Sequence, residues 1–136
     1  MGLKILSWLL LWAYVAFMYW ATVFSRADYE QSSINWTPFW TYKAIANGSS
    51  YLIADVINNV VMFIPIGLLL SFLITKKYWW LVLVFGVVIS ITIELLQLYL
   101  QRGLCEMDDI IHNTIGCLLG LAIVIGLKYL RSERYV

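Results

Sequence analysis

The stretch Gln101–Asn113, QRGLCEMDDIIHN, is a polar interruption in an otherwise apolar chain. It carries an arginine, a glutamate and two adjacent aspartates, and it ends in a histidine and an asparagine. Apolar runs long enough to cross a bilayer lie on both sides, at Trp79–Leu100 and Ile110–Leu130. We therefore predict that the stretch joins two membrane helices. Part of its polarity would start the second helix at a water boundary, with Asp108 as the N-cap.

The composition of the 136-residue chain is that of a membrane protein. Hydrophobic residues make up 62%, charged residues 12%, and the mean hydropathy is +0.83, whereas soluble domains are about 25% charged. A net charge of +1 without a basic patch gives no reason to expect a nucleic-acid partner. We expect residues 1–136 to form a single membrane domain.

Four membrane-spanning helices are predicted, at about residues 3–24, 52–74, 79–100 and 108–130. The tryptophans and tyrosines of the first run argue against a cleaved signal peptide. Cations collect at one end of this all-α arrangement: Lys4, Lys76, Lys77, Lys128, Arg131 and Arg134, against Arg26, Lys43 and Arg102 at the other. The bias predicts that both termini are cytoplasmic and that residues 25–50 and 101–107 are external.

The external loop, Ser25–Ser50, contains an aromatic cluster around Pro38. Its members are Trp36, Phe39, Trp40 and Tyr42, a composition typical of the headgroup zone. We expect this cluster to lie on the outer leaflet, and Trp36, Phe39 and Trp40 are candidates for a lid over a site. Cys105, in the joint, and Cys117, in the last helix, are expected to be free thiols.

Polar residues mark one face of each of the two middle helices. Asp55, Asn58 and Asn59 are spaced to lie together near the outer end of the 52–74 helix. Glu94 and Gln97 climb the 79–100 helix towards the same end, with Glu94 ~10 Å below its exit. An ionisable group at that depth costs on the order of 2.5–3.5 kcal/mol, so it should face the bundle interior and have a partner. Candidate partners are Asn58, Asn59, His112 and Asn113.

The last helix carries a stripe formed by Asp109, Asn113, Gly116 and Gly120. The two glycines have GxxxG spacing, which allows another helix backbone to approach closely. We expect this contact to hold the polar groups against the two middle helices. Pro65 should bend the 52–74 helix beside them, and Arg102 should form an ion pair with Asp108, Asp109 or Glu106.

Three segments together resemble the VanZ-like family of small bacterial membrane proteins in order and spacing. They are Asn58–Gly67 (NNVVMFIPIG), Ile93–Gln97 (IELLQ), and Arg102-Gly103 followed by Asp108–Gly116 (DDIIHNTIG). The resemblance runs from about Asn35 to Gly120 and implies a multi-pass protein of the bacterial cytoplasmic membrane. Its archetype gives low-level resistance to teicoplanin, a glycopeptide with a fatty-acyl tail. The family's polar motif falls on Asn58 or Asn59, Pro65, Glu94, Gln97, Arg102, Asp108, Asp109, Asn113 and Gly116, and leaves His112 outside.

The leading functional hypothesis is a non-enzymatic protein that binds an amphiphile in a polar pocket in the outer half of the membrane. The ligand would be a membrane lipid, a lipid-linked wall precursor or the lipoglycopeptide antibiotic itself, with Arg102 attracting an anionic group. The expected ligand-binding residues are Asn58, Asn59, Glu94, Gln97, Arg102, Asp108, Asp109 and Asn113.

Two other classes of function stay open. In a membrane enzyme acting on such an amphiphile, Glu94 and Asp109 would be the acid and base, since neighbouring buried carboxylates separate in pKa. In a structural protein, the polar cluster would only fix helix packing. The sequence has no metalloprotease-like spacing and no serine or cysteine nucleophile with an identifiable histidine, so neither a metal nor another cofactor is expected.

Overall fold

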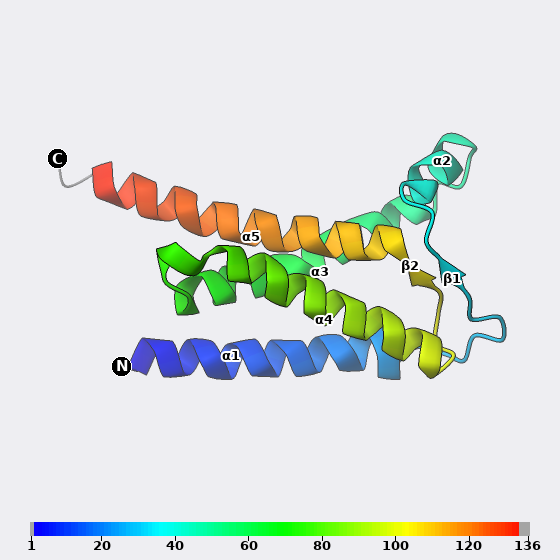
Figure 1. Ribbon diagram of the computed structural model, residues 1–136, viewed down its shortest axis with the longest axis horizontal. Helices are drawn as coiled ribbons and strands as arrows, with labels where there is room; N and C mark the ends of the chain where they lie inside the picture. The colour runs from blue at the N-terminus through cyan, green and yellow to red at the C-terminus, as the bar shows by residue number, and fades with distance from the viewer. Residues whose placement is uncertain (1, 134–136) are drawn as a thin grey trace.

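The computed structural model describes residues 2–133 and consists of an antiparallel bundle of four long helices (Figure 1). They are α1 (Gly2–Tyr19), which continues as the five-residue π-helix η1 (Trp20–Phe24), α3 (Leu52–Leu73), α4 (Trp80–Tyr99) and α5 (Met107–Glu133). Four spans in the described chain are long and apolar enough to cross a membrane. The predicted all-α, four-span architecture is confirmed, and the chain is a multi-pass membrane protein.

The two ends of the bundle differ in what they carry. The start of α1 and the end of α5 lie at one end, together with the short 3-10 turn η2 (Lys76–Tyr78) between α3 and α4 (Figure 1). The first loop and the joint between α4 and α5 lie at the other end, which we call the loop end. This shared position is what the sequence led us to expect. The assignment of the loop end to the outside stays a prediction from the positions of the lysines and arginines.

The first loop is more ordered than the sequence indicated. A two-residue strand, β1 (Ile34–Asn35), pairs in parallel with β2 (Cys105–Glu106) of the joint, so that Ile34 lies opposite Cys105. The seven-residue helix α2 (Trp40–Ala46) follows. Two further backbone hydrogen bonds, Tyr29 to Gln101 (2.7 Å) and Cys105 to Ser33 (3.0 Å), connect loop and joint. Elements this short leave no recognisable periodicity, which is why the sequence did not predict them.

Close packing of α5 on α3 forms the centre of the bundle. A Cβ at Gly116 would lie 2.2 Å from the Val60 carbonyl oxygen, and one at Gly120 would lie 2.3 Å from that of Ile64. Any side chain at either position would therefore push the two helices apart. The predicted GxxxG contact is present, with α3 as the partner, and Pro65 lies inside α3 as expected.

The outer faces of the helices are strongly apolar. Large side chains such as Trp12 (65% exposed) and Leu127 (57% exposed) point away from the core, while Phe63, Ile66 and Val82 fill it. In water such surfaces would be strongly unfavourable, but acyl chains solvate them well. Cys105 and Cys117 are both buried free thiols; Cys105 belongs to β2.

Candidate functional site

A cleft of about 300 Å³ opens at the loop end between the first loop, α2, the start of α3, the joint and the start of α5. Aromatic side chains contribute part of its wall, from Tyr29, Trp40 and Tyr51. The polar lining consists of Arg26, Thr41, Asp55, Asn59, Arg102, Glu106 and Asp109. Segments far apart in sequence therefore supply charged groups to one small volume.

Asp109 and Asn59 join α5 to α3 at the floor of this lining. The Asn59 Nδ2 donates a hydrogen bond of 2.6 Å to Oδ1 of Asp109. Both positions lie close above the seam where Gly116 meets Val60, so the backbone approach places the two side chains within reach. The convergence expected from the sequence is present for this pair.

Glu94 lies behind the cleft rather than in its wall. The residue is 2% exposed, and its Oε2 accepts a hydrogen bond of 3.0 Å from the backbone N–H of Glu106. The carboxylate thus faces the interior, as its depth predicted, and it fixes the joint at β2. Its partner is the Glu106 backbone, which was not among the four side chains that we expected: Asn58, Asn59, His112 and Asn113. It does not line the cleft.

Glu106 lies in β2, outside the helices that cross the membrane, and is partly buried. Burial raises its pKa to about 7, and the nearby carboxylates of Asp109, Asp108 and Asp55 add to the effect, while Arg26 opposes it. Its Oε1 is buried and has no hydrogen-bond partner among the described residues. Near neutral pH this group is therefore poised between its two protonation states.

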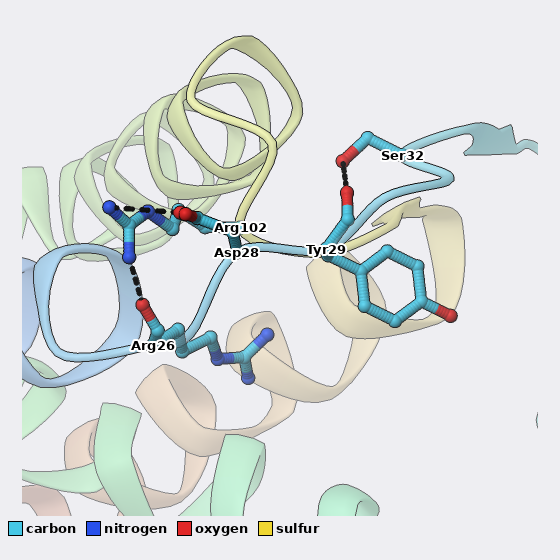
Figure 2. Close-up of polar contacts among 5 residues, drawn as sticks. All are labelled: Arg26, Asp28, Tyr29, Ser32 and Arg102. Atoms are coloured by element: carbon cyan, nitrogen blue, oxygen red, sulfur yellow. Dashed lines mark hydrogen bonds and ion pairs between the residues drawn. The ribbon is translucent and has the colours of Figure 1, made fainter.

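The two arginines of the cleft differ in their ion pairing (Figure 2). Arg102 forms an ion pair of 3.1 Å with Asp28 and donates a hydrogen bond to the carbonyl oxygen of Arg26. Our expectation that it pairs with Asp108, Asp109 or Glu106 was wrong, because the first loop folds back over the joint and offers Asp28 first. The Arg26 guanidinium extends away from Arg102 (Figure 2). Among the described side chains, no carboxylate lies within ion-pair distance of it.

Gln97 and Asn113 make contacts between helices and do not line the cleft. Gln97 is 3% exposed and donates from Nε2 to the Thr22 carbonyl oxygen in η1, at 2.9 Å. Asn113 is also 3% exposed and donates to Ser90 Oγ at 2.8 Å. The side-chain carbonyl oxygen of each is buried without a hydrogen-bond partner among the described residues.

Asp108 is fully buried and holds α2 instead of lining the cleft. Its two carboxylate oxygens accept hydrogen bonds from the backbone N–H groups of Phe39 (2.5 Å) and Thr41 (2.9 Å). Because α5 already starts at Met107, Asp108 lies inside the first turn and is not the N-cap that we expected. It caps a different helix, at a point where Phe39 has a left-handed φ of 62°.

The other candidate residues from the sequence are His112, Asn58 and the three possible lid residues. His112 is buried, and its Nε2 lies 2.9 Å from the hydroxyl of Tyr42. Asn58 is exposed and does not line the cleft, although its neighbour Asn59 does. Of the three candidate lid residues, Trp40 lines the cleft, whereas Trp36 and Phe39 are more than half exposed elsewhere.

The sequence reasoning missed several residues of the cleft as site candidates: Arg26, Tyr29, Tyr51, Asp55 and Glu106. Three of them left a signal. Arg26 is a cation directly after the first span, Glu106 is an acid in the polar joint, and Asp55 shares a predicted helix face with Asn59. Tyr29 and Tyr51 became identifiable only when the loop was seen to fold onto the joint. Within the described residues, no group of three or more histidines, cysteines and carboxylates has the geometry of a metal site.

Comparison with known proteins places this arrangement in a family. The VanZ/LLP1 family matches residues 6–129, which includes every residue that lines the cleft. Protein VanZ of Enterococcus faecium is 35% identical over 125 residues, covering 87% of this chain and 73% of that protein. No solved structure matches the chain significantly. On the length of the family match and this identity, the chain belongs to the VanZ/LLP1 family.

Proposed function

We propose that this protein, located in the bacterial cytoplasmic membrane, binds an amphiphile in the cleft at the loop end and thereby lowers susceptibility to teicoplanin. The observation that carries the proposal is the cleft itself: a charged, aromatic-lined volume at the end of four lipid-facing helices. Membership in the VanZ/LLP1 family supports the link to antibiotic resistance.

The surroundings of the cleft suit a molecule with a polar head and an apolar tail. Tyr51 lines the cleft and is 70% exposed at the start of α3. Further along α3, Val61 lies about 80° around the helix from Tyr51 and is also exposed, at 54%. A head group in the cleft could therefore continue into an acyl chain that lies along an apolar helix face. An acyl chain that enters from water gains ~0.8 kcal/mol for each CH₂ group buried, whereas the chain of a lipid already in the bilayer gains nothing further from this term.

Binding accounts for the geometry better than acid–base catalysis by Glu94 and Asp109. Such a reaction needs both carboxyl groups within reach of the substrate. Only Asp109 lines the cleft, and Glu94 is engaged with the backbone of Glu106 behind it. We therefore favour a binding function, with Asp109 and Asn59 at the head group.

The test uses adjacent asparagines that differ in their position relative to the cleft. In a strain whose teicoplanin resistance depends on this protein, Asn59→Leu and Asp55→Asn should lose resistance at normal membrane levels. Asn58→Leu, at an exposed position outside the cleft, should keep it. Full resistance of both cleft variants at normal levels would contradict the proposal. Lipid mass spectra with and without the protein then separate binding from chemistry, because a new lipid species requires a reaction.

A further inference from the structure

The balance of charge in the cleft is negative. Three carboxyl groups, those of Asp55, Glu106 and Asp109, line it together with two guanidinium groups. The charge of Arg102 is matched by Asp28, which does not line the cleft. This leaves Arg26 as the cation opposite three acids. A purely anionic head group would meet repulsion here, since like charges close together in a poorly solvated site are unfavourable.

One hydrogen-bond acceptor without a donor belongs to the lining of the cleft, and a second lies behind it. Glu106 Oε1 is buried and accepts no hydrogen bond from the described residues. The same holds for Oε1 of Gln97, a residue that is 3% exposed. That oxygen lies 3.5 Å from where a Cβ of Gly103 would stand, and Gly103 lines the cleft. Buried acceptors without donors are unfavourable, so a ligand that brings N–H donors gains by satisfying them.

Donors for an anion are also available in the cleft. The Arg26 guanidinium has no ion-pair partner among the described side chains. The indole Nε1 of Trp40, another residue of the lining, is buried and has no acceptor among the described residues. A phosphate oxygen could accept hydrogen bonds from both groups. The wall therefore offers sites for one anion and for one cation with N–H donors.

We propose that the cleft selects a zwitterionic head group that combines one phosphate with a primary ammonium, as in phosphoethanolamine, and that a membrane lipid carries it. This inference rests on the proposed function and specifies its ligand. The phosphate lies at Arg26 and Trp40, and the ammonium lies among Glu106, Asp109 and Asp55. A primary ammonium has three donors, whereas the trimethylammonium of a choline head group has none. A volume of about 300 Å³ suits a lipid head group and is at the lower limit for drug-sized ligands.

The experiment measures lipid binding to the purified full-length protein in detergent by native mass spectrometry. Three lipids with identical acyl chains are compared: phosphatidylethanolamine, phosphatidylcholine and phosphatidylglycerol. We expect phosphatidylethanolamine to bind about tenfold tighter than either of the others, the effect of a single charge-assisted hydrogen bond. Equal or tighter binding of phosphatidylcholine or phosphatidylglycerol would overturn the inference.

Variants of the cleft residues test which side chains bind the ammonium and which bind the phosphate. Glu106→Gln and Asp55→Asn should lose the preference for phosphatidylethanolamine over phosphatidylglycerol, and Arg26→Gln should weaken binding of both lipids. Glu30→Gln and Lys43→Gln, at exposed positions outside the cleft, serve as matched controls. Because Asp55 is exposed, its variant should fold even if Glu106→Gln does not. Unchanged selectivity in folded Asp55→Asn and Glu106→Gln would refute the assignment.

Further outcomes separate this inference from the function on which it rests. If no lipid binds, both proposals fail. If phosphatidylglycerol or phosphatidylcholine is preferred, an amphiphile site remains and only the head-group assignment fails. Free phosphoethanolamine should compete better than glycerol phosphate, and equal competition would count against the inference. If free phosphoethanolamine binds as tightly as the lipid, the head-group chemistry stands and the amphiphile proposal fails.

Discussion

Replacing Asp108 by asparagine should release α2 from the end of the bundle. The carboxylate accepts two backbone hydrogen bonds, from Phe39 and Thr41, and an asparagine side chain can replace one of them at most. Its NH₂ group would then face the other N–H as a second donor. The helix has seven residues, far below the length at which an isolated helix is stable in water. Its persistence therefore depends on such external contacts.

The expected size of the effect follows from burial. Thr41 is 4% exposed, so an unsatisfied N–H there costs about 1–3 kcal/mol, while the exposed Phe39 can recover part of its loss from water. The left-handed φ of 62° at Phe39 adds about 1–3 kcal/mol of strain that the carboxylate no longer offsets. A total of at least about 2 kcal/mol corresponds to a ~30-fold increase in the population of the opened α2.

Hydrogen exchange detected by mass spectrometry measures this opening directly. Peptides covering residues 39–46 should exchange at least ~30-fold faster in Asp108→Asn, while peptides from α3 and α4 stay protected. Glu30→Gln, an exposed acid in the same loop, is the control and should leave the exchange unchanged. Wild-type protection of α2 in Asp108→Asn would show that the carboxylate does not hold the helix, and the reasoning would be refuted.

Three further predictions concern packing, pH and the surface. Gly116→Leu should destabilise the fold by more than about 3 kcal/mol, because its side chain would collide with the Val60 backbone; a melting temperature like that of wild type would contradict this. Burial raises the pKa of Glu106 from 4.5 to about 7, so its contribution to stability is complete below pH 4.5 and is lost as the pH rises through 7. Melting curves from pH 4 to 8 should therefore show Glu106→Gln gaining stability relative to wild type, and a constant difference would exclude the shift. Asp28→Asn should lower the free energy of unfolding, measured by chemical denaturation, by less than about 1 kcal/mol, because Asp28 is 83% exposed in its ion pair with Arg102. A larger decrease would mean that the ion pair holds the loop in place.

Local pattern was enough to predict the membrane architecture and the location of its polar groups. Span length and hydropathy are properties of contiguous sequence, so the four helices could be placed almost to the residue. The GxxxG contact was also predictable, because Gly116 and Gly120 must share a face whatever they pack against. The depth of Glu94 required an interior position with a partner, and the structure supplies both.

Which polar residue faces which neighbour depended on helix rotation and on the path of the loop. Consecutive residues of a helix point about 100° apart, so Asp108 reaches α2 while Asp109 reaches Asn59, and Asn58 is exposed where Asn59 is not. No local signal fixes that rotation, because it is set by the packing of α5 on α3.

The partners of the arginines and of Glu106 could not be predicted from the sequence either. They follow from contacts such as that between Arg102 and Arg26, 76 residues apart, which exist only after the first loop pairs with the joint. The chain by itself determined that acidic and amide side chains gather at the loop end of a membrane bundle, because span positions follow from local hydrophobicity. Only the tertiary structure decided that Arg26, Asp55 and Glu106 share a cleft there, because long-range contacts bring them together.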